Sequence, residues 1–160
     1  ELARRREEYD ALALALEGLN EANAQLQERF SPPINRSAGA ILAQLTGGKY
    51  DKVTLTREFE ASAEEKDGVL PRRALVLSQG TAEQLYLAVR LAICDLVLSG
   101  GERVPLVLDD ALDAFDDRRA ALALDYLRRA AAERQILLFT CHGREGALAG
   151  SWPEVRVTRL

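Results

Sequence analysis

The sequence is poor in the residues that bind transition metals or form disulfides. It holds two cysteines and one histidine in 160 residues. Cys94 and Cys141 stand alone, without the short spacing that zinc ligands show, so neither a disulfide framework nor a zinc site is predicted. A reducing, cytoplasmic setting fits this cysteine usage best. The sequence also lacks a run of about 18 apolar residues, which a membrane helix needs, and shows no signal-peptide pattern.

An excess of positive charge is missing as well. The net charge is -4 and the pI is near 5.2, which argues against a domain whose whole surface binds nucleic acid. The arginine pairs 72–73, 118–119 and 128–129 are interpreted as solvated faces. With 48% hydrophobic residues, the chain can fill one ordinary core. It starts within a helical pattern and without methionine, which indicates a fragment of a longer protein.

No phosphate-binding loop with its lysine is present. Gly47-Gly48-Lys49 comes nearest, but Ala43 stands where the loop pattern needs its first glycine. Tyr50 follows the lysine in place of serine or threonine. We therefore interpret the tripeptide as a turn that closes a helix.

The first 30 residues carry a heptad pattern. Apolar residues recur in alternating steps of three and four, at Tyr9, Leu12, Leu16, Leu19, Leu26 and Phe30. Asn23 falls in the same register as a polar position, so the segment predicts a coiled-coil helix with a partner helix. The alternative is an amphipathic helix packed on its own domain. Ser31-Pro32-Pro33 is expected to end this helix, and a second helix is expected over 34–45.

Two strands and a buried helix are predicted next. Residues 52–60 alternate polar and apolar side chains, as in a half-exposed strand, and include Arg57 and Phe59. Residues 61–68 read as a polar connection ending in a hairpin turn, with a returning strand over 69–77 that runs through 74–77. After Gly80 the apolar period becomes 3.6 and predicts a core helix that reaches residue 99.

The segment Leu77-Ser78-Gln79-Gly80-Thr81 precedes that helix. Thr81 and Gln84 fit a capping box, in which both side chains satisfy free backbone donors. A serine and a glycine at the positive end of a long helix also suit an anion such as phosphate. The simpler alternative is a capped helix without a ligand.

Two adjacent acids follow a short apolar strand. Residues 104–108 are uniformly apolar, as in a parallel strand buried on both faces, and Asp109 and Asp110 stand at its carboxyl end. Consecutive strand residues point to opposite faces, so the two acids are expected to act differently. Asp109 would face Mg²⁺ and Asp110 an attacking water. The alternative is that one of them caps the following turn.

A second strand is predicted to reach the same edge. After the acidic loop 113–117, a helix over 118–132 leads to an apolar strand over 135–140 and then to His142. A right-handed crossover puts both strand ends on one edge, near Asp109 and Asp110. The alternative is that this histidine is only structural. Residues 152–160 read as a closing edge strand.

Taken together, these segments resemble the C-terminal half of an ABC-type ATPase head of the SMC, SbcC and RecN group, and most of all its YhaN-like members. Leu77-Ser78-Gln79-Gly80-Thr81 matches the signature motif and residues 104–110 the Walker B strand. Ala114-Phe115-Asp116 matches the D-loop, and His142 the switch histidine. The resemblance implies an α/β fold with a mostly parallel sheet and flanking helices. Residues 1–30 would be a coiled-coil return helix and 31–160 the head lobe.

The resemblance also implies the roles of these residues. ATP would lie between the phosphate loop of one head and the signature residues of a second, which here are Ser78, Gln79, Gly80 and Thr81. Asp109 would hold Mg²⁺ through water, while Asp110 and His142 would be catalytic. Asp110 stands where the family usually has glutamate, and Gln79 where it often has glycine.

Partners and activity follow from the same resemblance. The expected partners are an N-terminal Walker A lobe with the antiparallel coiled-coil helix, a second head in a homodimer and DNA, with a nuclease subunit as a further candidate. The expected role is DNA repair or chromosome maintenance, and the isolated chain is expected neither to bind ATP tightly nor to hydrolyse it. The alternative is a catalytically inert lobe for dimerisation. A transporter domain is disfavoured, because it has no heptad helix before the signature turn.

Overall fold

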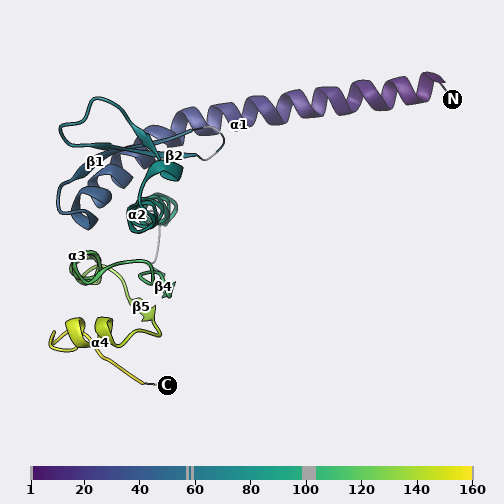
Figure 1. Cartoon of the computed structure of the whole chain (residues 1–160). Helices are drawn as coiled ribbons and strands as arrows, with labels where there is room; N and C mark the ends of the chain where they lie inside the picture. The colour runs from purple at the N-terminus through teal and green to yellow at the C-terminus, as the bar shows by residue number, and fades with distance from the viewer. Residues whose placement is uncertain (1, 57, 59, 99–103, 160) are drawn as a thin grey trace. The chain divides into compact units, whose positions relative to one another are not determined.

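The computed structural model describes residues 2–56, 58, 60–98 and 104–159, in two compact units, 1–33 and 34–160. The elements, shown in Figure 1, are α1 (Leu2–Leu45), β1 (Tyr50–Leu55), β2 (Ala61–Glu65), β3 (Arg72–Arg73), the 3₁₀ helix η1 (Ala74–Val76), α2 (Gln79–Val97), β4 (Leu106–Asp109), α3 (Asp117–Ala130), β5 (Ile136–Phe139) and α4 (Gly143–Ala149).

Helix α1 continues through Pro32 and Pro33, so the predicted helix end at this point is wrong. Each proline removes one backbone donor, but its fixed φ is itself helical. The last turns of the helix are held by burial, because Ile41, Leu42 and Leu45 lie in the core of the second unit. This packing outweighs the local preference against helix before proline, and the separate helix expected over 34–45 is the end of α1.

The heptad residues of the first unit are exposed. Tyr9, Leu12 and Leu19 each leave about 70% of their surface open to solvent. An apolar seam of this kind is what a coiled-coil helix presents to a partner helix. Gly47 and Gly48, just after the helix, both have positive φ, which confirms the predicted turn.

Strands β1, β2 and β3 form an antiparallel sheet in that order. The predicted strand over 52–60 is confirmed only in its first half, as β1, which ends at Leu55. Thr56, Glu58 and Glu60 are not part of a strand, and Arg57 and Phe59 lie outside the described residues. The predicted connection over 61–68 is wrong in its first half, which is β2. Ala61 and Ala63 are buried there, and such small core-facing residues do not stand out in a polar sequence.

The returning strand expected over 69–77 is confirmed only at Arg72 and Arg73, which form β3 and pair with β2. The next three residues form η1 instead of continuing the strand. Leu75 and Val76 are exposed there, so no buried apolar face holds this segment in a strand. The turn between β2 and β3 closes where Gly68 N–H donates to Glu65 O.

Helix α2 is the centre of the core. Leu85, Ala88 and Ala92 are almost completely buried, as the 3.6 period predicted. Figure 1 shows α2 between the antiparallel sheet and α3. The helix ends at Val97, and the predicted endpoint at residue 99 lies outside the described residues.

Strands β4 and β5 pair in parallel, with α3 between them in the chain, so the predicted strand, helix and strand unit is confirmed. Their burial differs from the prediction. Leu108 is buried, but Val107 is 57% and Phe139 46% exposed. A parallel strand becomes buried on both faces only when layers cover both sides of its sheet. Here the described residues leave one face of this sheet open.

The chain ends in α4 and a series of turns, and the closing edge strand expected over 152–160 is wrong for the described residues up to 159. Trp152 packs against the core and lies under the guanidinium of Arg128, 5.0 Å from ring centroid to charged carbon. Burial of this aromatic ring fixes the segment without a backbone ladder.

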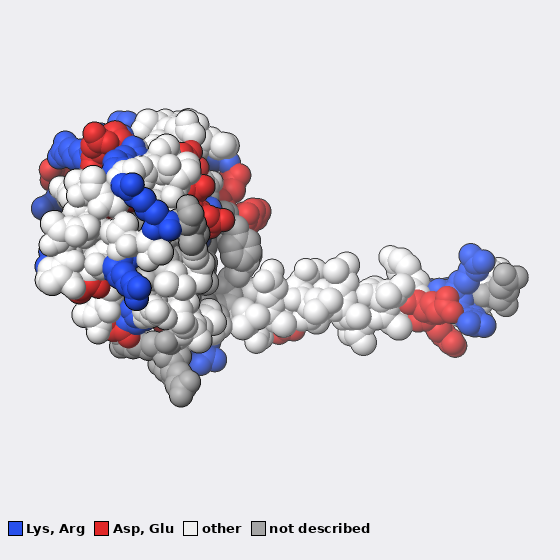
Figure 2. Space-filling view, turned by 90° about the horizontal axis from the view of Figure 1, so that it is seen from below, with Lys and Arg blue, Asp and Glu red and all other residues white. Residues whose placement is uncertain are grey.

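Charges of both signs mix on the surface. Figure 2 shows basic and acidic side chains together on the face that it presents. No helix in the described part of the chain combines the length and apolar character that a membrane span needs.

Gly39 permits the close packing of α1 on β1. A Cβ added at Gly39 would lie 2.5 Å from the backbone oxygen of Asp51, whereas one added at Gly18 would meet nothing within 4 Å. Replacing Gly39 with alanine should therefore destabilise the second unit by about 1–3 kcal/mol, the usual effect of overpacking.

Urea unfolding followed by the fluorescence of Trp152, the only tryptophan, measures this loss. The matched control is Gly18→Ala, which should leave the midpoint of this transition unchanged. Equal midpoints for the two variants would show that the Gly39 contact does not constrain the fold.

Candidate functional site

The residues matching the signature motif lie at the start of α2. Ser78 is the N-cap residue and is exposed, with its Oγ 2.8 Å from Thr81 Oγ1. Gln79 is also exposed, while Gly80 and Thr81 are buried. Only the first two polar residues of this segment are therefore open to a ligand.

The predicted capping box is wrong. Thr81 and Gln84 lie inside α2 rather than at its cap, and Gln84 is only 2% exposed. Gln84 Nε2 donates to the carbonyl oxygen of Leu45, the last residue of α1. This bond satisfies a helix-end carbonyl that would otherwise be buried without a donor. The side chain therefore joins two helices instead of closing one.

Gly80 brings the start of α2 close to the residues that match the D-loop. A Cβ added here would lie 3.1 Å from Ala114 O and 3.4 Å from the side chain of Arg119. These distances are tighter than ordinary carbon contacts. Phe115, the next residue of the loop, is buried in the core and anchors it. The missing side chain of Gly80 thus lets the start of α2 pack closely against Ala114 within the lobe.

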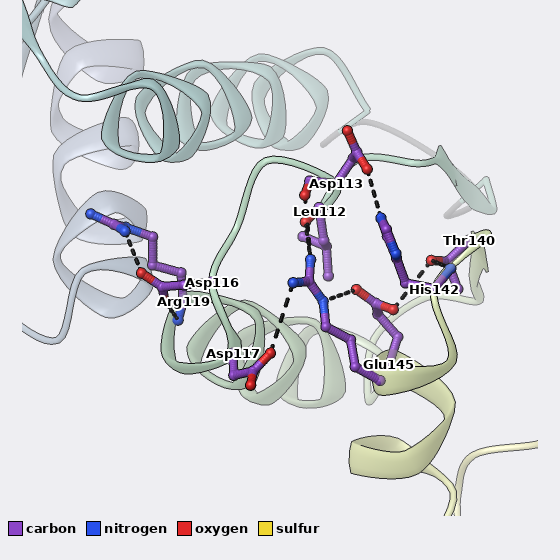
Figure 3. A network of polar contacts seen from close by, with 9 residues as sticks. Leu112, Asp113, Asp116, Asp117, Arg119, Thr140, His142 and Glu145 are labelled. Atoms are coloured by element: carbon purple, nitrogen blue, oxygen red, sulfur yellow. Dashed lines mark hydrogen bonds and ion pairs between the residues drawn. The ribbon is translucent and has the colours of Figure 1, made fainter.

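Arg119 connects α2 with the D-loop residues. Its Nε donates to Gln84 Oε1 at 3.2 Å and one terminal nitrogen to Thr81 Oγ1 at 3.3 Å. Its other terminal nitrogen pairs with Asp116, as Figure 3 shows. The interpretation of Arg119 as part of a solvated face is therefore wrong, because its side chain is half-buried and bonds to Gln84 and Thr81 of α2.

Asp116 also caps α3. Its Oδ1 accepts a hydrogen bond from the backbone N–H of Arg119 at 2.8 Å. This backbone bond, and then the charge of Arg119, keeps the pKa of the Asp116 carboxyl below its ordinary value. Asp116, the last residue of the segment that matches the D-loop, is thus a charged N-cap at neutral pH.

Asp109 and Asp110 end β4, as predicted, and both are exposed. Asp110 has a φ of 44°, in the left-handed region, which aspartate tolerates better than most residues. Its backbone N–H donates to Phe139 O, and its Oδ1 accepts from the Cys141 N–H at 3.0 Å. The carboxylate of Asp110 therefore joins the ends of the two strands.

Asp109 remains open. No hydrogen bond or ion pair connects its side chain with the rest of the described chain. An exposed carboxylate of this kind is the hard oxygen donor that Mg²⁺ prefers, so this residue fits the predicted ion.

His142 reaches the same edge, three residues after β5 ends at Phe139. Its Nε2 lies 2.6 Å from Asp113 Oδ1, so its side-chain partner is Asp113 rather than Asp109 or Asp110. Its backbone N–H donates to Thr140 Oγ1 at 3.0 Å. The crossover argument correctly predicted the edge, but not the partner.

Arg144 holds the loops after β4 and β5 together. It donates to Leu112 O at 2.8 Å and to the carboxylate of Glu145, which is 2% exposed. Glu145 in turn accepts from Thr140 Oγ1 at 3.2 Å (Figure 3). Neither Arg144 nor Glu145 was predicted to contribute, because helix α4 itself was not predicted.

Cys141 lies beside the acids. Desolvation, followed by the charge of Asp110 and a hydrogen bond to it, raises the pKa of the Cys141 thiol. Cys141 is therefore a neutral thiol at physiological pH, next to a histidine and two carboxylates.

Replacing Arg119 with methionine tests the connection between α2 and the D-loop residues. The change leaves the buried Gln84 Oε1 without its donor, so the free energy of unfolding should fall by about 1–3 kcal/mol. Urea unfolding measures this loss. Arg118→Met, at the exposed neighbouring position, is the matched control and should change stability by less than about 0.5 kcal/mol. Equal losses in both variants would contradict a specific role for Arg119.

Known proteins share this fold. No family model matches the chain. Over 113 residues, 69% of the chain, it is 35% identical to the uncharacterized protein YhaN of Bacillus subtilis strain 168. The chain spans only 12% of the length of that relative.

Solved structures agree over a larger part of the chain. A structure from work on ATP-driven dimerization and DNA-stimulated activation of SMC ATPases matches with a TM-score of 0.64 at 20% identity, over 79% of this chain and 78% of that one. The SMC head with an extended coiled coil from Pyrococcus furiosus, bound to the C-terminal domain of ScpA, matches with a TM-score of 0.58 at 21% identity. This match covers 92% of this chain and 39% of that one. The SMC head domain of Thermotoga maritima matches with a TM-score of 0.57 at 18% identity, over 79% of this chain and 44% of that one. The chain therefore has the fold of the C-terminal region of an SMC-like ATPase head.

Proposed function

We propose that the chain supplies one half of a composite ATP site, which is completed by a Walker A lobe and a second head. The observation that carries this proposal is the position of Asp109, Asp110 and His142, which follow two paired parallel strands at one edge of the sheet. Such edges are where open α/β sheets bind nucleotides. Residues 104–110 are the proposed Walker B strand, and 1–30 the coiled-coil return helix that precedes the lobe at 31–160.

The open face of β4 and β5 supports the need for another lobe. Val107, Leu137 and Phe139 expose 40% or more of their surface on this short sheet. A Walker A lobe that extends or covers the sheet would bury them, and it would add the phosphate loop that this sequence lacks. The proposed partner is therefore the N-terminal lobe at the other end of an antiparallel coiled coil, for which the heptad seam of α1 offers the contact.

Each residue at the edge has a proposed role. Mg²⁺, when bound with ATP, neutralises charge on the phosphates, and Asp109 would hold it through water. Asp110 would orient and activate the attacking water, with its carboxylate held by the Cys141 N–H. His142 would sense the terminal phosphate after leaving its present bond to Asp113.

The start of α2 is proposed to meet the nucleotide of the second head. Ser78 and Gln79 are exposed there and can approach it directly, at the positive end of the helix. Gly80 and Thr81 lie inside and set this surface through their contacts with Ala114 and Arg119. Residues 114–116 would then couple nucleotide binding at one half of each site to the structure of the other half.

The whole protein is proposed to act on DNA, in repair or chromosome maintenance. The support is fold-level analogy to SMC heads, one of which belongs to work on DNA-stimulated activation. A homodimer of heads is the proposed active form, in a cytoplasmic setting, and a nuclease subunit is a candidate partner. The isolated chain is proposed to be inactive, because half of the phosphate-binding groups are in the other lobe.

The second candidate is a lobe that dimerises without catalysis. It is favoured by Asp110 itself, since aspartate is one methylene shorter than the glutamate usual at this position. A shorter side chain that is also tied to Cys141 reaches less far toward a water.

Asp110→Asn, in a protein that contains both lobes, separates the two candidates. Without the carboxylate, ATP turnover should fall by about 100-fold or more, because a general base contributes roughly that much. ATP-dependent dimerisation, measured by light scattering, should persist, because asparagine keeps the oxygen that accepts from Cys141.

The matched control is Asp67→Asn, in the exposed turn after β2, which should turn over ATP at the normal rate. Retained turnover in the Asp110 variant would contradict its proposed role. A parent protein that dimerises equally with and without ATP, and never hydrolyses it, would support the inert lobe.

A further inference from the structure

A thiol, an imidazole and a carboxylate lie together at the edge of β4 and β5. Asp113 comes from the turn after β4, while Cys141 and His142 follow β5. One ligand atom from each side chain lies within 4.8 Å of the other two. Figure 3 shows Asp113 and His142 facing each other across the gap between the two loops.

We infer that these three residues form a binding site for a thiophilic divalent cation, and that Zn²⁺ is the ion it fits best. Sulfur, imidazole nitrogen and carboxylate oxygen are the donors that Zn²⁺ takes in proteins, whereas Mg²⁺ takes oxygen alone. Three protein ligands leave a fourth position for water. The site is separate in its ligands from the Mg²⁺ position assigned to Asp109.

The distances are close to those of a tetrahedral zinc site. Zinc bonds of about 2.0–2.3 Å place neighbouring ligand atoms roughly 3.3–3.8 Å apart. The present cluster spans that range, with its atoms between the 2.6 Å of the His142–Asp113 contact and the 4.8 Å limit. Shifts of about 1 Å at the side-chain ends therefore bring all three into the first shell of one ion.

The side chains that must move are free to do so. The Asp113 side chain is 65% and the His142 side chain 41% exposed, so small rotations meet no packed neighbours on their open sides. The backbone beneath them is fixed, because the Cys141 N–H donates to Asp110 and the His142 N–H donates to Thr140. The site therefore combines a fixed backbone with side-chain ligand atoms that can adjust their positions.

Binding exchanges existing contacts for metal bonds. The hydrogen bond between His142 and Asp113 opens, and each atom then binds the ion. The Cys141 thiol loses its proton to the solvent when the ion binds, and the sulfur coordinates as thiolate. Without Cys141, His142 and Asp113 would form an ordinary histidine–carboxylate contact. The sulfur atom is therefore the ligand that distinguishes a metal site from a surface ion pair.

A regulatory consequence rests on the proposed function. His142 Nε2, which would face the terminal phosphate during hydrolysis, is held away from it when bound to Zn²⁺. Zinc should therefore inhibit ATP turnover. The metal site itself does not depend on this role.

The direct test is a titration of the 160-residue chain with Co²⁺, in the absence of nucleotide. The parent chain should show thiolate-to-cobalt absorption in the near ultraviolet, saturating at one ion per chain, and Zn²⁺ should displace it. Cys141→Ser should abolish this absorption. It should also lower Zn²⁺ affinity at least tenfold, since even indirect partners of metal ligands contribute about 10- to 100-fold.

The matched control is Cys94→Ser, which removes the half-buried thiol of α2 and should leave the cobalt spectrum unchanged. Asp113→Asn and His142→Ala should each weaken binding, and circular dichroism should show that all variants are folded. The inference is overturned if the parent chain lacks the absorption band, or if the band survives Cys141→Ser or depends on Cys94.

The second arm uses a protein that contains both lobes. Zn²⁺ should inhibit its ATP turnover, and Cys141→Ser should relieve this inhibition, measured in each protein as the ratio of turnover with zinc to turnover without it. Zinc-insensitive turnover in a protein that binds Co²⁺ would overturn the regulatory consequence alone. A protein that binds Co²⁺ but never hydrolyses ATP would contradict the proposed function and leave the metal site standing.

Discussion

The parallel pairing of β4 with β5 is the constraint on which the rest of the site depends. It runs in register from Leu106 with Ile136 to Asp109 with Phe139, so both strands end together. The Asp110 carboxylate then accepts from Cys141 N–H and extends the pairing by one side-chain bond. Because the two strands end at one level, two acids and an imidazole from distant parts of the chain lie within one small region.

Residues 114–116, which match the D-loop, form a link between this edge and the start of α2. On one side Arg119 contacts Gln84 and Thr81, and a glycine lets Ala114 approach α2. On the other side Arg144 donates to the carbonyl of Leu112, just before the D-loop residues. Two arginines thus fix one loop from both directions. The lobe holds these residues in a defined arrangement by itself, which would reduce the reorganisation needed to assemble the proposed composite site.

Sequence reasoning succeeded where local pattern and chain topology decide the structure. The 3.6 period predicted α2, and the handedness of the crossover predicted the edge on which His142 lies. It failed where distant packing decides. Burial of its last turns keeps α1 helical past two prolines, and the partners of Arg119 are more than 30 residues away. The exposure of Phe139 likewise depends on which layers cover the sheet, and the grouping of Asp113 with Cys141 depends on how two distant loops fold. Residue spacing in the sequence contains neither kind of information.

The central claim is that this lobe completes an ATP site together with a Walker A lobe and a second head. The most direct measurement is a crystal structure of a protein that contains both lobes, with a non-hydrolysable ATP analogue and Mg²⁺. The account predicts Asp109, Asp110 and His142 around the terminal phosphate bound by their own head, Ser78 facing the nucleotide of the other head, and Phe139 buried. Nucleotide bound away from the ends of β4 and β5, or a sheet face still open to solvent, would contradict it.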